Sequence, residues 1–494
     1  MTKGSHSMTT DPALRRLANA TLLVPFPSRV PPRWVLDELE DGLGGVVLFY
    51  FNIGGPRQLS ELTRRLREAG GDPIVSLDEE GGDVTRLGHL TASRYPGNAA
   101  LGAVDDEAVT RSVYRALGED LRAVGVTVNL APSVDVNAAE DNPVIGTRSF
   151  GADPDLVARH GVAAIQGLRD AGIAACAKHF PGHGSTRQDS HHLLPTVDAG
   201  LDELDRRELP PFRAAIAAGV DAVMTAHVRI PAVTGEDPAT LSPAAITGLL
   251  RERLGYTGPV ITDALEMQGA SGAIGIPEAS VRALLAGNDL LCLGADQGPE
   301  VIAACRDAIV AAVRDGRLPG DRLEEAARRA TLLRRRVPEP GEADARPAEE
   351  GADVGLDAAR RAIRVHGEVG ELRDPLIVEI TAPPGMAVGN VPWGLGPWLG
   401  GDGRSAEATR VGPESDPAPL LDLARDRSLV VVVRDAHRYP RTRRLVGDLV
   451  AGRPDAVVVE MGIPAWRTAA AAHVETYGAT AASARAALEL LLPS

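Results

Sequence analysis

Between residues 20 and 336 the chain alternates short apolar runs with longer segments of helical composition, and this pattern constrains the fold more than any other feature. The runs lack the polar/apolar alternation of a half-exposed strand, so they are typical of parallel strands buried on both faces. Eight such runs lie at residues 21–26, 45–51, 73–80, 126–136, 173–180, 222–228, 259–265 and 289–295.

The segments between the runs are long enough for the crossover helices that parallel strands require. Residues 105–124, 155–171 and 204–219, for example, are rich in alanine, arginine, leucine and glutamate. Eight βα units in about 315 residues predict an α/β fold, a (β/α)8 barrel of the TIM type. A doubly wound open sheet stays an alternative, because strand order cannot be read from the sequence.

The length of 494 residues exceeds what one hydrophobic core normally supports, so a second domain is expected. Residues 1–7 resemble the remnant of an expression tag, with Met8 as the expected natural start. We predict a barrel at 8–336, a Pro/Gly/acid-rich linker at 337–355 and a smaller C-terminal α/β sandwich domain at 356–494. In this last domain, buried parallel strands are predicted at 376–381, 428–435 and 456–462, with helices near 357–365, 441–451 and 479–492.

Composition and charge exclude several classes of protein. The formal net charge of −15 repels phosphate backbones and no basic stripe offsets it, so nucleic-acid binding is not expected. No run approaches about 18 apolar residues and no signal peptide is recognisable, so no membrane association is expected. Three cysteines without a CxxC pair argue against a disulfide framework or a zinc cluster and favour a cytoplasmic location. The sequence leaves monomer and homodimer open.

Polar side chains follow most of the predicted barrel strands, at the face where barrel enzymes concentrate their chemistry. They are Asp78, Glu79, Glu80 and Arg86 after the third run, Asp135 and Arg148 after the fourth, Lys178 and His179 in the fifth, His227 in the sixth and Asp263 in the seventh. A single aspartate at a strand end is often only a helix cap or half of a surface ion pair. Five converging strand ends are harder to dismiss, because burying unpaired charge costs several kcal/mol. Of these residues, Glu79 and Glu80 are expected to be structural.

Residues 178–195, KHFPGHGSTRQDSHHLLP, are the most informative stretch. Lys178 is the only lysine if Met8 is the start, which suggests a need for a compact ammonium charge. The stretch holds four histidines, but it has no HExxH or Cys/His quartet spacing and its glycines favour a mobile loop, so no metal site is expected. Asp189 and His191 fit a mobile acid/base dyad, because a neighbouring carboxylate fixes the imidazole tautomer and raises its pKa.

This stretch resembles the signature of the glycoside hydrolase family 3 β-N-acetylhexosaminidases of the bacterial NagZ type, which carry KHFPGHGDT followed by DSHxxxP. Five other motifs agree with the family in order and spacing. They are SLDEEGGDVTRL (76–87), NLAPSVDVNAAEDNPVIGTRSFG (129–151), MTAHVRIPAV (224–233), PATLS (238–242) and GPVITDALEMQGA (258–270). The resemblance covers roughly residues 15–336.

The resemblance implies a retaining exo-β-N-acetylglucosaminidase that needs neither metal nor other cofactor. Asp263 matches the nucleophile, and His191 with Asp189 behind it matches the acid/base dyad that protonates the leaving oxygen and then activates water. Asp78 resembles the carboxylate that grips the 4- and 6-hydroxyls of the sugar. The residues that match the rest of the sugar pocket are Arg86, Arg148, Lys178 and His179, with His227 as a wall residue and Asp135 as a support of the arginines.

The chain departs from the family pattern at two motifs. Ser185 stands where the family has an acidic residue after GHG, and Thr262-Asp263-Ala264 stands where it has SDD. Neither change removes a residue with an assigned chemical role. His192 directly follows His191, so either imidazole could face the sugar, although the DSH spacing favours His191.

The C-terminal domain resembles the second domain of some two-domain members, but its motifs are too generic to carry a role. Its loop residues Asp435, His437 and Trp393 are interpreted as surface or inter-domain packing. The other interpretation is that a loop of this domain roofs the barrel mouth or reaches a neighbouring subunit's site.

The expected substrates are cell-wall turnover products such as muropeptides, consistent with peptidoglycan recycling, or small GlcNAc conjugates. Three alternatives stay open. A neutral imidazole would tolerate phosphate as the attacking group, which allows a phosphorylase, and the substrate could be a GlcNAc-conjugated natural product. The barrel could also be a catalytically silent sugar-binding sensor, although the presence of Asp263, Asp189 and His191 together argues against it.

Overall fold

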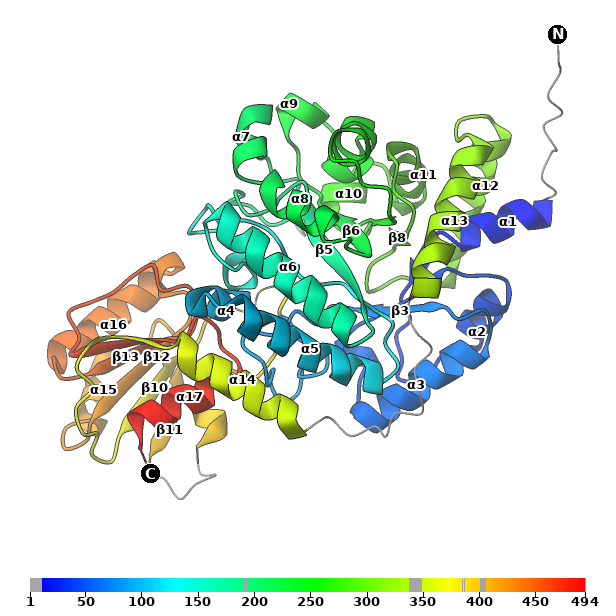
Figure 1. Ribbon diagram of the computed structural model, residues 1–494. Helices are drawn as coiled ribbons and strands as arrows, with labels where there is room; N and C mark the ends of the chain where they lie inside the picture. Colours follow the sequence, from blue (N-terminus) through cyan, green and yellow to red (C-terminus); the bar gives the residue numbers. More distant parts are fainter. Residues whose placement is uncertain are drawn as a thin grey trace, which may run out of the picture.

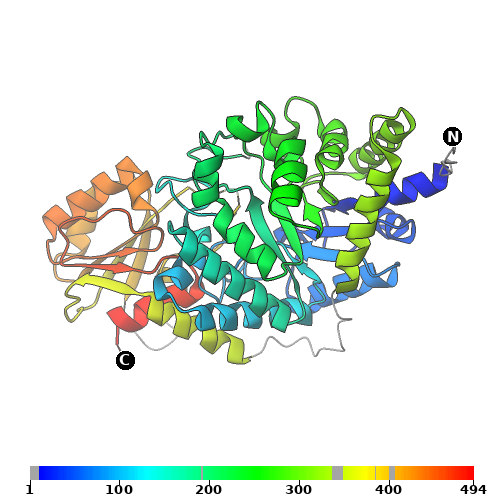
Figure 2. The ribbon, with the colours of Figure 1, turned by 45° about the horizontal axis from the view of Figure 1, so that its top comes forward.

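The computed structural model describes residues 11–190, 193–336, 349–383, 385, 387–399 and 406–493. They form two α/β units of unequal size that lie side by side (Figure 1). The larger, N-terminal unit is a barrel surrounded by helices (Figure 2). The smaller unit is a sheet with helices packed on both faces.

Eight parallel strands form the barrel sheet in the order β7-β6-β5-β4-β3-β2-β1-β8. A parallel bridge between Ile261 at the end of β7 and Leu290 just before β8 closes the ring. Each predicted run contains one buried strand, so the predicted barrel is confirmed and the open sheet is excluded. The strands are β1 (Leu22–Val24), β2 (Gly45–Leu48), β3 (Ile74–Leu77), β4 (Val128–Asn129), β5 (Ala174–Phe180), β6 (Ala222–Thr225), β7 (Val260–Ile261) and β8 (Leu291–Cys292).

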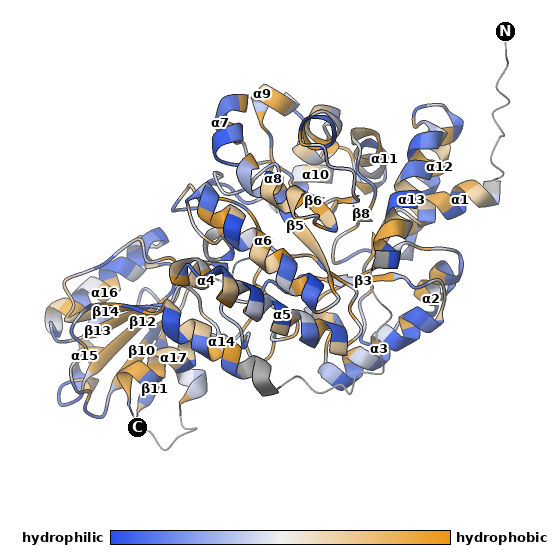
Figure 3. Ribbon diagram, viewed as in Figure 1, coloured by the Kyte–Doolittle hydropathy of each residue, from blue (hydrophilic) through white to orange (hydrophobic). Residues whose placement is uncertain are grey.

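Helices cover the outside of the barrel. Hydropathy varies around each helix because one face is buried and the other is exposed to solvent (Figure 3). In α6, for example, Asp153 caps the first turn by accepting the Asp155 amide at 2.9 Å, while Val157 and Leu168 are buried. No helix in the described residues is long and apolar enough to cross a membrane. The helices of this unit are α1 (Asp11–Asn19), α2 (Arg33–Glu40), α3 (Pro56–Glu68), α4 (Asn98–Val104), α5 (Glu107–Ala123), α6 (Pro154–Asp170), α7 (Leu201–Arg206), α8 (Leu209–Ala217), α9 (Pro231–Thr234), α10 (Gln268–Ser271), α11 (Ile276–Ala286), α12 (Pro299–Arg314) and α13 (Gly320–Arg336), with a π-helical segment at Ala244–Arg253.

The C-terminal sheet has the order β11-β10-β12-β13-β14-β9, and only β9 runs antiparallel to its neighbour. The three predicted strands are present as β10 (Leu376–Ile380), β12 (Leu429–Val433) and β13 (Val457–Glu460). The sequence did not indicate β9 (Arg364–Gly367), β11 (Glu407–Val411) and β14 (Ala472–Glu475). Strands β9 and β11 lie at the sheet edges and are largely exposed, so they lack the apolar run that marks a buried strand. The helices are α14 (Glu349–Ala362), α15 (Pro417–Leu423), α16 (Pro440–Gly452) and α17 (Ala481–Leu491).

The segment that the sequence predicts to be a linker differs in part. Residues 337–348 lie outside the described residues, but residues 349–355 are helical and form the start of α14. Helix α14 packs on α4 and α5 of the barrel and on α17. Gly355 passes so close to the Arg94 carbonyl that an added Cβ would lie 2.1 Å from its oxygen. Tertiary packing thus overrides the weak helix propensity of a segment that contains two glycines.

The two units meet at the loop after β3. Asp83 in that loop accepts the Thr147 hydroxyl (2.6 Å) and the Ala479 amide (3.0 Å), and forms an ion pair with Arg434 (3.0 Å). The first partner belongs to the barrel, whereas the other two belong to the C-terminal domain. The C-terminal domain therefore packs on the same loop that carries several candidate site residues.

Candidate active site

The centre of the candidate site is Lys178, at the end of β5. Its ammonium donates to Asp78 Oδ1 at 2.7 Å and lies 2.6 Å from Glu80 Oε1, and the residue is only 1% exposed. Burial alone would lower the pKa of Lys178, but the two carboxylates outweigh it and raise that pKa above its ordinary value. The compact ammonium group of a lysine fits between these two carboxylates, which both lie beyond the end of β3.

Glu80 also pairs with Arg148, whose Nε and Nη2 donate to its two oxygens at 2.9 and 2.7 Å. Burial alone would raise the pKa of Glu80, but the charges of Arg148 and Lys178 hold it well below its usual range. Arg148 Nη2 lies 3.4 Å from His179 Nε2, which links the pair to β5. Glu80, expected to be structural, thus fixes the two cations of the site. We call Asp78, Glu80, Arg148, Lys178 and His179 the polar clamp.

Asp135 supports the clamp through contacts with His179 and with the His183 backbone. Its Oδ2 lies 2.7 Å from His179 Nδ1, and its Oδ1 accepts the His183 amide at 2.7 Å. Burial would raise the pKa of this carboxyl, but the neighbouring histidines and their hydrogen bonds bring it down to about 2. Asp135 was predicted to orient the arginines. The structure instead bonds it to His179, because the His179 ring lies between Asp135 and Arg148.

Arg86 lies at the edge of the clamp, 3.5 Å from Asp78 Oδ2. Its backbone amide and that of Leu87 both donate to Glu79 Oε2 at 2.8 Å, so Glu79 shapes the turn that carries Arg86. Burial raises the pKa of Glu79 to about 7, against the effect of these amide bonds. Arg86 Nη1 also donates to the Ala387 carbonyl of the C-terminal domain at 3.4 Å.

Asp263 follows β7 by two residues and is half-buried, with its Oδ1 accepting the Ala264 amide at 2.8 Å. His227 lies beside it, with Nε2 at 3.0 Å from the Ala264 carbonyl and Nδ1 at 2.9 Å from the Thr240 hydroxyl. His227 is fully buried and, through its contact with the Ala264 carbonyl, supports the strand end that carries Asp263. A direct contact of His227 with sugar stays a prediction.

The loop after β5 (residues 181–195, called here the β5 loop) is held at its start by His183. The His183 ring lies 3.1 Å from the Ser190 hydroxyl and 3.0 Å from the Thr186 hydroxyl. Burial lowers the pKa of His183 to about 4. Ser185, at the position where the family has an acidic residue, donates to the buried carboxylate of Glu208.

Asp189 is half-buried on the β5 loop, whereas His191 and His192 lie outside the described residues. Asp189 faces a cavity of about 290 Å³ between the barrel and the C-terminal domain. His437 closes one side of this cavity through a 2.9 Å contact of its Nε2 with the Glu140 carbonyl. The polar residues that line the cavity are Glu140, Asn142, Thr147, Asp189, Arg434, Asp435, His437, Arg438 and Tyr439.

The structure thus brings Asp78, Arg86, Arg148, Lys178 and His179 together at the carboxyl ends of β3 to β5, and places Asp263 at the same face. Sequence reasoning missed Asp83 and Arg434, which form an ion pair with each other across the two domains. No group of three or more His, Cys, Asp or Glu side chains that could hold a metal ion occurs among the residues the structure describes. The cysteines Cys176, Cys292 and Cys305 are free and buried.

Comparison with known proteins shows the family of the chain. Residues 29–333 match the model of the glycosyl hydrolase family 3 N-terminal domain. The chain belongs to glycoside hydrolase family 3. The predicted resemblance is therefore confirmed, and the chain is an enzyme of this family.

Named relatives of this family 3 enzyme are β-hexosaminidases. The chain is 38% identical over 311 residues to β-hexosaminidase LpqI of Mycobacterium tuberculosis, covering 60% of this chain and 77% of that relative. It is 37% identical over 269 residues to β-hexosaminidase A of Pseudoalteromonas piscicida, covering 50% of this chain but only 45% of that relative. A solved family 3 β-N-acetylglucosaminidase from Paenibacillus sp. str. FPU-7 superposes with a TM-score of 0.86 at 34% identity, over 97% of this chain and 96% of that one. The two-domain arrangement is thus shared with a solved family member.

Proposed function

We propose that this family 3 enzyme is a retaining exo-β-N-acetylglucosaminidase that removes terminal β-linked GlcNAc. The observation that carries the proposal is the prearranged polar clamp, which lies at the same face of the barrel as Asp263. Within the clamp, Asp78 keeps 20% of its side chain exposed, whereas Lys178 and Glu80 are buried behind it. Asp78 is therefore the carboxylate that would meet sugar hydroxyls, and the buried residues would fix its position.

In the proposed reaction, an Asp263 carboxylate oxygen attacks the anomeric carbon, and the bond from that carbon to the leaving oxygen breaks. His191, steadied by Asp189, gives its proton to the leaving oxygen. In the second step water attacks the anomeric carbon, the ester to Asp263 breaks, and His191 takes the proton from water. Two inversions give net retention. A histidine with an ordinary pKa near 6.5 serves both roles at neutral pH without adding a second negative charge beside Asp263.

We propose that the leaving group lies in the cavity between the domains. Asp189 lines that cavity, and the acid must lie on the leaving-group side of the broken bond. Arg434, Asp435 and Tyr439 would then contact the leaving group from the C-terminal domain. This supports the interpretation in which a loop of that domain roofs the barrel mouth.

The test is turnover of p-nitrophenyl β-GlcNAc with and without inorganic phosphate. Phosphate-independent release with retained configuration is the expected result. A phosphate-dependent rise would instead indicate a phosphorylase, and no release under either condition would favour a sugar-binding sensor. Release of GlcNAc from muropeptides would support a role in peptidoglycan recycling. The cytoplasmic location stays a prediction.

A further inference from the structure

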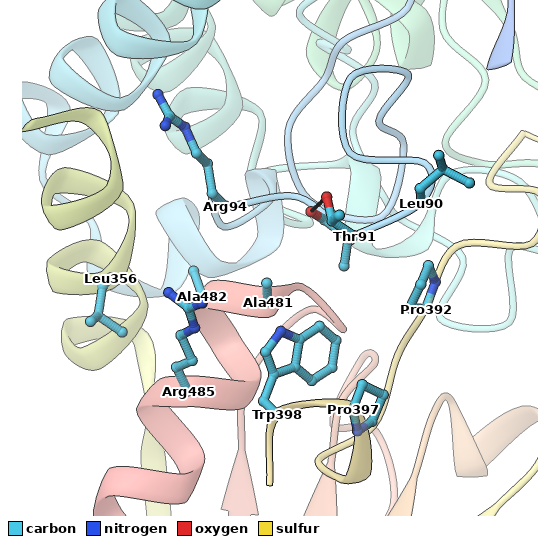
Figure 4. Close-up of a pocket in the computed structure, with 11 residues that line it drawn as sticks. Leu90, Thr91, Arg94, Leu356, Pro392, Pro397, Trp398, Ala481, Ala482 and Arg485 are labelled. Carbon is cyan, nitrogen blue, oxygen red and sulfur yellow. Dashed lines mark hydrogen bonds between the residues drawn. The ribbon is translucent and has the colours of Figure 1, made fainter. Parts of the chain in front are cut away.

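A second, larger cavity of about 460 Å³ lies at the seam between the two domains (Figure 4). None of the proposed catalytic residues lines it. Its walls come from the barrel loop at residues 90–94, from α14, from the loop at 392–398 and from the start of α17. The volume lies in the range of pockets that hold small ligands.

The apolar part of this cavity is built around Trp398. Its indole stands in the hollow between Ala481, Pro397 and Thr91 (Figure 4). Trp398 is only half-buried, and Leu90 on the opposite loop is 62% exposed. An indole face with a neighbouring open space is a flat apolar platform, which matches the C–H face of a sugar ring.

The charged part of the cavity is positive, although the whole chain carries −15. Among the residues that the structure describes, two arginines line the cavity and no aspartate or glutamate does. Arg94 is already committed, since its Nη2 donates to Asp120 at 2.7 Å. Arg485 is exposed and forms no ion pair or hydrogen bond with any residue that the structure describes. Its guanidinium is therefore available for an anionic group on a ligand.

We propose that this cavity is a second, non-catalytic binding site for a carboxylate-bearing saccharide. One sugar face would stack on Trp398, and the carboxylate would pair with Arg485. The two contacts together select this class, because a neutral sugar would leave the guanidinium unused and a small carboxylate would leave the indole uncovered. The proposal does not depend on the catalytic mechanism, since it concerns a different cavity of the protein.

The test compares methyl β-glucuronide with methyl β-glucoside, which differ only in the carboxylate, and with acetate, which lacks the ring. Ligand-observed NMR titrations would be run on the full chain, on Arg485→Gln, on Trp398→Phe and Trp398→Ala, and on Arg444→Gln. Arg444 is an exposed arginine on α16, outside the cavity, and is the matched control.

We expect the glucuronide to bind at least about tenfold more tightly than the glucoside or acetate, and Arg485→Gln and Trp398→Ala each to weaken it about tenfold. Trp398→Phe should keep most of the affinity, and Arg444→Gln all of it. Hydrolysis of p-nitrophenyl β-GlcNAc should be unchanged in Arg485→Gln. Absence of glucuronide binding, equal affinity for acetate, or undiminished binding by Arg485→Gln would each overturn the proposal. If the unsubstituted enzyme does not hydrolyse p-nitrophenyl β-GlcNAc, that result would contradict the proposed function but not the proposed second binding site.

Discussion

The β5 loop begins directly after the clamp residues Lys178 and His179, yet the polar clamp and the loop hold their side chains in different ways. In the clamp, Lys178 and Glu80 are buried, and each of them contacts two partners of opposite charge. On the loop, Asp189 is half-buried and faces a cavity that is shared with another domain. The clamp is fixed by the barrel itself, whereas the surroundings of Asp189 depend on the C-terminal domain.

This difference matches the two tasks that we propose. Groups that recognise a sugar gain from being fixed before the sugar arrives, because no reorganisation is then needed. A group that gives a proton to the leaving oxygen and later takes one from water must serve two geometries in turn. A loop outside the barrel suits that second task.

The largest effect is expected from Asp263→Ala, which removes the proposed nucleophile at the fixed face. Turnover of p-nitrophenyl β-GlcNAc should fall by at least about 10⁴-fold. A fluorinated donor should label Asp263 in the unsubstituted enzyme, as peptide mapping would show. Asp315→Ala, an exposed aspartate after α12, is the control and should leave turnover unchanged. Labelling of a different residue would place the nucleophile elsewhere.

The next effect concerns the β5 loop. His191→Ala should slow alkyl GlcNAc glycosides by about 10²- to 10⁴-fold, because their leaving oxygen needs a proton in the transition state. Activated aryl glycosides should lose far less, and the unfolding midpoint should stay the same. Equal losses for both leaving groups would move the acid role to another residue, and His192→Ala would then be measured first.

In contrast to His191→Ala, which should leave the unfolding midpoint the same, a substitution in the clamp should mainly lower the stability of the fold. Lys178→Met leaves the buried carboxylate of Glu80 and the half-buried one of Asp78 without their shared cation, so the free energy of unfolding should fall by about 3–5 kcal/mol. Arg64→Met, which breaks exposed pairs with Glu61 and Glu68, should cost no more than about 1 kcal/mol. Urea denaturation measures both. An equally small loss for the two variants would mean that the clamp is no more rigid than the surface.

Whether a contact of the site could be predicted from the sequence depends on how far apart its two residues lie in the chain. Asp78 follows β3 and Lys178 lies near the end of β5. Because the apolar runs reveal both strands, the convergence of the two residues was predictable from the barrel alone. Asp83 and Ala479 are 396 positions apart, and no local pattern relates an aspartate of a barrel loop to an amide before the last helix. Glu80 was expected to be structural, but its two cationic partners, Lys178 and Arg148, lie far along the chain and no local pattern relates them to it.

A smaller effect is expected from pH at the start of the β5 loop. Burial lowers the pKa of His183 from 6.5 to about 4, so the unfolded chain takes up this proton first as the pH falls. The contribution of His183 to stability is therefore full above pH 6.5 and is lost between about 6.5 and 4, amounting to about 3 kcal/mol. In His183→Asn, the free energy of unfolding should depend less on pH across this interval. An unchanged slope would show that His183 does not stay neutral in the folded loop.

The smallest effect tests whether the C-terminal domain contacts the leaving group. Tyr439 lines the cavity that Asp189 faces, so Tyr439→Ala should raise KM for a GlcNAc disaccharide by about 3- to 10-fold, the loss of one aromatic contact. Methyl β-GlcNAc has too small a leaving group to reach Tyr439, and its KM should not change. If both substrates lose equally, Tyr439 acts through the shape of the whole site, and the cavity is not a leaving-group subsite. A change confined to the disaccharide would show that both domains share in recognising the substrate, with the barrel fixing the sugar and the second domain selecting what is attached to it.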